Sequence, residues 1–172
     1  FWVKALSHGC LRLYQGTDVV GLQIGATLKN PLAVAAGMAD GLGLGANARA
    51  ALITRSLAEM IRLGTRLGAR SETFTGLAGI GDLLLSATSD LSRNRRLGLA
   101  LGRGASIAEA QKSIGQLVES IDNIASILAI AEKQGVPMPI VQAVYAVLEN
   151  KKTPKEAMDH LLMRKPTSEH AQ

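Results

Sequence analysis

The residues best suited to chemistry are concentrated in the segment 76–96, GLAGIGDLLLSATSDLSRNRR. Asp82 is a single carboxylate in a glycine-spaced apolar run. Burying an unpaired charge costs several kcal/mol, a cost comparable to the stability of a marginal domain. We therefore expect Asp82 to have a cationic or hydroxyl partner.

The end of the same segment combines a capping residue with clustered arginines. Ser92 is typical of a helix N-cap and would put Arg93, Arg95 and Arg96 in the first helical turn. The helix dipole makes that end positive, which is unfavourable for cations unless an anion binds there. Backbone N–H groups, the dipole and guanidinium groups together favour a phosphate. We predict a phosphate site at Ser92, Arg93 and Asn94, and the alternative is a solvated basic helix start.

Lys29 is a third candidate for chemistry. It is the one cation between Arg12 and Arg49 and stands between apolar segments. A desolvated amine whose pKa is lowered toward neutrality could act as a general acid or base. Alternatively, Lys29 could reach solvent along its own apolar stem. Pro31 is expected to kink or interrupt the helix here, which would release backbone carbonyls near Lys29 and Asn30.

Composition indicates a helical protein with one main domain. The 172 residues are 47% hydrophobic and 19% charged, so a compact core can form. Aromatic residues make up only 3%, which favours close helix packing over a sheet sandwich. Cys10 is the only cysteine, so an internal disulfide is excluded and a cytoplasmic location is the default. Three histidines and one cysteine share no metal-ligand spacing, and we expect no metal.

The elements that must position these residues are predicted to be helices. Apolar spacing predicts helices over 18–44, capped by Asp18, and over 48–67. Further helices are predicted after Ser92, from Ser106 with Glu109 in a capping box, and over 121–134, 138–148 and 153–164. The strand signal is limited to 11–14.

The predicted helix 48–67 is amphipathic. Ile53 and Met60 lie on its apolar face, while Arg55, Glu59 and Arg62 lie on the opposite one. We expect Glu59 to form ordinary surface pairs with Arg55 and Arg62, which contribute only tenths of a kcal/mol.

Charge alone leaves other classes of function open. A net charge of +5 suits an anionic ligand or nucleic acid, but the few aromatic residues offer no stacking platform and the arginines form no single stripe. No membrane helix is expected, because Lys29, Asp40 and Arg49 interrupt the best apolar run. A helical dimerisation module is compatible with the apolar helices after residue 121, but it would leave Lys29 and Asp82 unexplained.

Several segments together resemble the C-terminal domain of bacterial NAD(P)-dependent glycerol-3-phosphate dehydrogenase. They are LKNPLAVAAGMADGLGLGANARAALITRSLAEM, GLAGIGDLLLSATSDLSRNRRLGLALGRG, GQLVES and VPMPI, within 18–162. The resemblance implies a mainly α, multi-helical substrate domain of the 6-phosphogluconate dehydrogenase C-terminal-like type. It also implies an oxidoreductase that interconverts dihydroxyacetone phosphate and sn-glycerol 3-phosphate with NAD(P)H and supplies phospholipid synthesis in the cytoplasm.

The resemblance assigns roles residue by residue. Lys29 matches the general acid/base and substrate-binding lysine, and Asn30 lies beside it. The remaining matches are Asp82 and Ser86 for substrate, Ser92, Arg93 and Asn94 for the phosphate, and Arg93, Leu117 and Glu119 for the cofactor.

The family also implies a second domain. Its relatives have an N-terminal Rossmann domain, which binds most of the cofactor. Because Phe1 begins the chain without an initiator Met, we expect 1–16 to be a remnant of that domain, with 11–14 as its last strand. Residues 17–165 would form the helical substrate-binding and catalytic domain, and 166–172 a frayed tail. The fragment alone is expected to be inactive. The expected partner of the protein is a small phosphorylated substrate, with no nucleic acid or membrane partner, and a homodimer is compatible.

Overall fold

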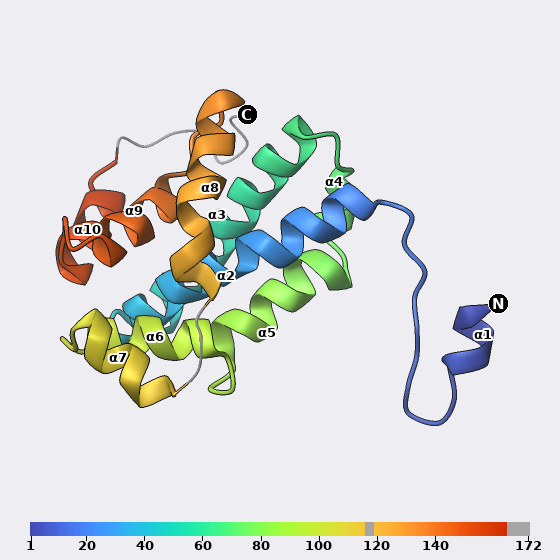
Figure 1. Cartoon of the computed structure of the whole chain (residues 1–172), viewed down its shortest axis with the longest axis horizontal. Helices are drawn as coiled ribbons and strands as arrows, with labels where there is room; N and C mark the ends of the chain where they lie inside the picture. Colours follow the sequence, from blue (N-terminus) through green and yellow to red (C-terminus); the bar gives the residue numbers. More distant parts are fainter. Residues whose placement is uncertain (116–118, 165–172) are drawn as a thin grey trace.

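The computed structural model describes residues 1–115 and 119–164, except for the side chains of 119–122. Over these residues the chain is helical and contains no β-strand, which confirms the mainly α fold (Figure 1). The elements are α1 (Trp2–Leu6), α2 (Val19–Gly41), α3 (Gly45–Arg66), α4 (Ser71–Phe74), the π-helix η1 (Leu77–Gly81), α5 (Asp82–Thr88), α6 (Arg93–Gly102), α7 (Ile107–Ile114), α8 (Glu119–Lys133), α9 (Pro139–Leu148) and α10 (Pro154–Leu162).

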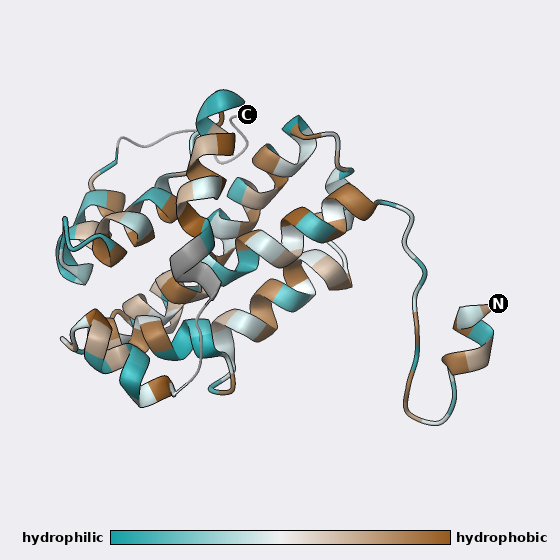
Figure 2. Cartoon of the chain, in the orientation of Figure 1, coloured by the Kyte–Doolittle hydropathy of each residue, from teal (hydrophilic) through white to brown (hydrophobic). Residues whose placement is uncertain are grey.

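Helix α2 is the centre of the bundle. It packs against α3, α5, α6, α8 and α9 (Figure 1). Every residue in the stretch 31–39 is buried, whereas hydrophobic and hydrophilic residues alternate along α3 (Figure 2). A helix that is apolar on all sides belongs in a protein core or a membrane. Here the surrounding helices account for the burial.

The length of α2 corrects one expectation from the sequence. Its 23 residues are long and apolar enough to cross a membrane by length and composition, and half of the relevant window is buried inside the fold. The expected interruption of the apolar run was wrong, because Lys29 and Asp40 lie within the helix without breaking it. Pro31 does not interrupt it either. Proline removes its own N–H bond and its ring crowds the carbonyl of the preceding turn, and buried neighbours on both sides offset this cost.

The start of α2 is fixed to α4. As predicted, Asp18 caps the helix, because its Oδ1 accepts from the Gly21 N–H at 2.9 Å. Its Oδ2 accepts from the Thr73 hydroxyl at 2.6 Å and from the Arg70 N–H at 2.8 Å. These hydrogen bonds lower the pKa of Asp18, and the bond from Thr73 has the largest effect.

Glycines allow α2 and α6 to touch along their backbones. A Cβ atom on Gly37 would overlap the carbonyl oxygen of Arg95, and one on Gly98 would overlap that of Val34. The same holds one turn further along the two helices, where Gly41 faces Gly102. Only glycine fits at such a contact. The helix–helix distance is therefore set by these four residues.

The N-terminal segment differs from the prediction. Residues 11–14 do not form a strand, and the only pairing there is an isolated β-bridge between His8 and Leu11. A strand needs a partner to satisfy its backbone groups, and within the described ranges no neighbouring strand offers one. Figure 1 shows α1 and the segment after it standing away from the bundle. The predicted tail 166–172 lies outside the described residues.

The later helices follow the prediction closely. The capping box of α7 is formed by Ser106 and Glu109, and α10 begins with a second box formed by Thr153 and Glu156. α8, α9 and α10 begin and end within about two residues of the predicted bounds.

Glu59 is the clearest error of the sequence analysis. It is only 1% exposed, so its expected place on the surface was wrong. Its carboxylate accepts from the N–H groups of Ile140 at 2.8 Å and Val141 at 3.4 Å, at the start of α9. α9 lacks a side-chain cap of its own, so Glu59 satisfies its N-terminal donors from α3. Burial raises the pKa of Glu59 to about 7, although these two hydrogen bonds oppose the shift.

This pKa makes stability depend on pH. The folded pKa of about 7 exceeds the ordinary 4.5, so between these values the folded protein keeps a proton that the unfolded chain has lost. Stability from this group is therefore highest below the ordinary value and decreases as the pH rises toward 7. Glu59→Gln cannot titrate, so between about pH 5 and about pH 8 its free energy of unfolding should gain about 2–3 kcal/mol relative to wild type.

Urea unfolding at both pH values measures this gain. Glu132→Gln, on the exposed surface of α8, is the matched control and should show no comparable change. A difference between Glu59→Gln and wild type that is independent of pH would contradict the assignment.

The α2–α6 contact predicts a costly substitution. Gly98→Ala should lower the free energy of unfolding by about 3 kcal/mol, because the added methyl group forces the two backbones apart. Gly81→Ala is the control, since the nearest contact of its Cβ would be 3.7 Å away. Similar urea midpoints for the two variants would mean that the helices tolerate a wider separation.

Candidate active site

Lys29 and Asp82 form an ion pair across α2 and α5. The ammonium Nζ donates to Asp82 Oδ2 at 2.6 Å, and the two side chains are 25% and 32% exposed. The partner expected for Asp82 is therefore a lysine 53 residues away in sequence. The Lys29 side chain is partly buried and ends in this ion pair.

The π-helix η1 places Asp82 at the start of α5. A Cβ atom on Gly79 would overlap the backbone of Phe74, and one on Gly25 would come within 2.9 Å of the Ala78 carbonyl oxygen. Both glycines let η1 lie close to its neighbours. π-Helical turns are rare and change the phase of a helix. This turn brings the Asp82 carboxylate toward α2.

The predicted phosphate-binding segment lies beside Lys29. Ser92 caps α6, as expected, and its Oγ accepts from the Arg95 N–H at 3.3 Å. Asn94 Nδ2 donates to Asn30 Oδ1 at 3.0 Å, which joins the first turn of α6 to the residue after Lys29. The Oδ1 atom of Asn94 is buried and has no hydrogen-bond partner within the described part of the chain. An orphaned polar atom of this kind suits a site that binds a polar ligand.

The three arginines of this segment do not act together. Arg93 is exposed at the first position of α6. Arg95 is buried and bonds to Asp40 and Asp90 instead. Arg96 lines a separate hollow of about 710 Å³ that also contains Arg49 and Arg103. Of the clustered arginines, Arg93 is the one that opens α6 at the predicted anion site.

Other predicted site residues have less structural support. Ser86 lies on α5, one turn beyond Asp82, and is half-buried. Leu117 lies outside the described residues, and Glu119 opens α8 without a described side chain. Among the described residues, no group of three His, Cys, Asp or Glu side chains could hold a metal ion.

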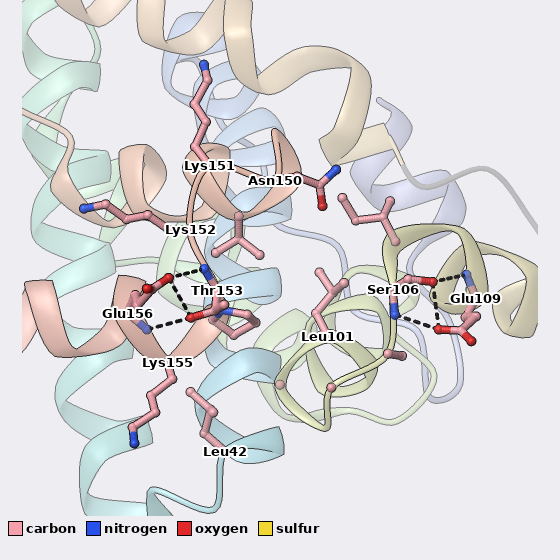
Figure 3. Close-up of a pocket in the computed structure, with 16 residues that line it drawn as sticks. Leu42, Leu101, Ser106, Glu109, Asn150, Lys151, Lys152, Thr153, Lys155 and Glu156 are labelled. Carbon is pink, nitrogen blue, oxygen red and sulfur yellow. Dashed lines mark hydrogen bonds between the residues drawn. The ribbon is translucent and has the colours of Figure 1, made fainter.

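The cavity in Figure 3 is separate from this site. It has a volume of about 610 Å³, lies between the α6–α7 and α9–α10 connections, and contains none of the predicted site residues. The capping boxes of α7 and α10 face it, each with its carboxylate bonded to its own N-cap residue (Figure 3).

Sequence reasoning missed the bonds of Asp40 to Arg49 and Arg95. A signal was present, because Asp40, like Asp82, is a single carboxylate in a largely apolar segment. The argument that predicted a partner for Asp82 would have predicted one for Asp40 as well.

Taken together, the geometry can bind a small anion and move a proton. The N-terminus of α6 and Arg93 provide positive charge and hydrogen-bond donors. The ammonium group of Lys29, oriented by Asp82, lies beside them and is accessible to solvent. A phosphorylated molecule with a reactive oxygen matches both features.

Comparison with known proteins gives a consistent result. A family model described as NAD-dependent glycerol-3-phosphate dehydrogenase C-terminus matches residues 18–159. The glycerol-3-phosphate dehydrogenase [NAD(P)+] of Idiomarina loihiensis is 54% identical over 158 residues, 92% of this chain and 47% of the relative. That of Polaromonas sp. is 54% identical over 168 residues, 97% of this chain and 48% of the relative. The chain thus spans about half the length of the curated relatives it matches.

A solved structure shows the same fold. The crystal structure of glycerol-3-phosphate dehydrogenase from Coxiella burnetii has a TM-score of 0.90 and 45% identity, covering 95% of this chain and 50% of that one. The resemblance seen in the sequence is confirmed.

The exposure of the Lys29–Asp82 pair predicts that it contributes little to stability. Lys29→Met and Asp82→Asn should each change the free energy of unfolding by less than about 1 kcal/mol, because partly exposed ion pairs are screened by water. Urea unfolding of the two single variants and the double variant measures this. A loss of about 3 kcal/mol or more would mean that the pair is mainly a structural element.

Proposed function

The chain belongs to the NAD-dependent glycerol-3-phosphate dehydrogenase family, and we propose that it is the substrate-binding and catalytic half of such an enzyme. The complete enzyme, meaning this chain together with the N-terminal half that its relatives possess, would interconvert dihydroxyacetone phosphate and sn-glycerol 3-phosphate. The observation that carries the proposal is the Lys29–Asp82 ion pair next to the start of α6.

The start of α6 is proposed to bind the phosphate. Ser92, Arg93 and Asn94 lie at its first turn, where backbone donors and the helix dipole favour an anion. Arg93 adds a full positive charge at the exposed edge. The phosphate would thus anchor the substrate with its carbon chain toward α2.

Lys29 is proposed to be the general acid and base. Its ammonium group would donate a proton to the carbonyl oxygen of dihydroxyacetone phosphate and would accept it from the alcohol in the reverse direction. Asp82 accepts from Nζ at 2.6 Å and so orients the ammonium group. Asn30 and Ser86 are proposed to contact the substrate beside Lys29. Solvent can restore the proton, because the lysine is partly exposed.

The cofactor is proposed to be NAD(P)H, which supplies the hydride when bound. The positive charge of Arg93 at the α6 N-terminus fits a phosphate-bearing cofactor on the exposed side of the site. Leu117 and Glu119 are proposed as further contacts. Residues 17–165 would form the substrate domain, and 1–16 would be the end of the dinucleotide-binding domain that binds most of the cofactor.

The isolated 172-residue chain is proposed to be inactive. It spans about half of its curated relatives, and hydride transfer needs the reacting atoms within about 3–3.5 Å of each other. Without the cofactor-binding half, that positioning is lost. In the cell, we propose that the complete enzyme acts in the cytoplasm and supplies glycerol 3-phosphate for glycerophospholipid synthesis.

Kinetics of the complete enzyme test this assignment. Lys29→Met, which is close in volume but carries no proton, should lower kcat by about 10²- to 10⁴-fold. Arg93→Ala should instead raise the KM for dihydroxyacetone phosphate by about tenfold or more, because it removes a charge-assisted contact.

Two controls accompany these variants. Arg55→Ala, on the exposed side of α3, should change neither constant, and the chain alone should not consume NADPH. Wild-type turnover in Lys29→Met, or equal KM values for the Arg93 and Arg55 variants, would overturn the assignment.

A further inference from the structure

We propose that Arg95 is a positioning residue, which orients the phosphate-binding residues Ser92, Arg93 and Asn94 through a guanidinium bridge between Asp40 and Asp90. The inference rests on the proposed function, because it concerns the same phosphate site. It adds a residue that does not itself contact substrate.

The bridge connects two parts of the fold. Arg95 Nη2 donates to Asp40 Oδ2 at 2.8 Å, near the end of α2, and Nη1 donates to Asp90 Oδ1 in the loop between α5 and α6. The side chains of Arg95 and Asp40 are each 10% exposed, whereas that of Asp90 is 87% exposed. The bond to Asp40 is therefore largely buried, whereas the bond to Asp90 connects Arg95 to an exposed loop.

The same residue is also tied down through its backbone. The Arg95 N–H donates to Ser92 Oγ at 3.3 Å, which forms the cap of α6. Its carbonyl oxygen lies where α6 touches Gly37 of α2. Arg93 and Asn94 lie between the Ser92 cap and Arg95 in sequence. The two backbone contacts of Arg95 therefore fix the orientation of the helical turn that carries them.

The bridge also resolves an electrostatic conflict. A cation in the first turn of a helix is unfavourable because of the helix dipole. In addition, the positive charges of Arg95 and Arg93 repel each other. Asp40 and Asp90 pair with this charge and so offset it. A planar guanidinium group can bridge two carboxylates at fixed angles, whereas a lysine ammonium group cannot reproduce that geometry.

Arg49 provides a matched comparison. It donates to the same Asp40 at 2.9 and 3.0 Å, but it comes from α3 and forms no bond to Asp90 or α6. When Arg95 is replaced, Asp40 still has Arg49 as a partner. The buried carboxylate of Asp40 is therefore still paired in an Arg95 variant.

The test uses steady-state kinetics of the complete enzyme. Arg95→Lys should raise the KM for dihydroxyacetone phosphate by about tenfold with little change in kcat, because misplaced binding groups weaken binding. Arg49→Lys should leave this KM within about twofold, because lysine keeps a charge on Asp40 and no group of the phosphate site moves. With dihydroxyacetone, which has no phosphate, Arg95→Lys and wild type should have equal kcat/KM.

Two further variants separate positioning from general damage to the fold. Asp90→Asn removes only the exposed arm and should raise the same KM by a smaller factor, about threefold. In the Arg93→Ala background, Arg95→Lys should raise this KM by a clearly smaller factor than in wild type, because the Arg93 contact that it would displace is already absent.

The outcomes are distinguishable. An unchanged KM in Arg95→Lys, additive effects with Arg93→Ala, or an equal loss of kcat/KM with dihydroxyacetone would overturn the positioning role. If Arg93→Ala itself leaves the KM unchanged, the proposed phosphate site fails as well.

Discussion

The close contact between α2 and α6 determines how the rest of the site is arranged. α2 carries Lys29 and Asn30, and α6 begins with the predicted phosphate-binding residues. Glycines at 37, 41, 98 and 102 bring the two backbones together. At this separation Asn94 reaches Asn30 and Arg95 reaches Asp40. Wider packing, as ordinary side chains would require, would separate the two halves of the site.

Charged residues inside this apolar bundle serve different purposes that depend on their exposure. Glu59 is nearly fully buried and is used only to cap α9. Asp40 and Arg95 are slightly exposed and connect α2 with the start of α6. The side chains of Lys29 and Asp82 are 25% and 32% exposed, which is more than those of Asp40 and Arg95. A proton-transferring group must be accessible, and this exposure supports the role proposed for Lys29.

The sequence predicted the helices and the Ser92 cap of α6 well, because both depend on local patterns. Ser92 and Ser106 are capping residues whose function involves only the next few residues. The need of Asp82 for a partner was also evident, but the identity of Lys29 was not, since it depends on how α2 and α5 pack. The family resemblance had already assigned both residues to one substrate site, and the structure shows that they are in contact.

The errors share one cause, which is that tertiary contacts can override a local pattern. Glu59 occupies a polar face by helical period, yet the first turn of α9 lies against it and uses the carboxylate as its cap. Residues 11–14 alternate like a strand but have no neighbouring strand in the described chain. Pro31 should break an isolated helix, and here the surrounding core stabilises it.

A crystal structure of the complete enzyme with glycerol 3-phosphate and oxidised cofactor would test the central claim most directly. The account predicts the phosphate at the first turn of α6, within hydrogen-bond distance of Ser92, Arg93 and Asn94. It also places the secondary hydroxyl of the substrate beside Lys29 Nζ. A phosphate bound instead in the hollow lined by Arg49, Arg96 and Arg103, with Lys29 distant from the substrate, would contradict it.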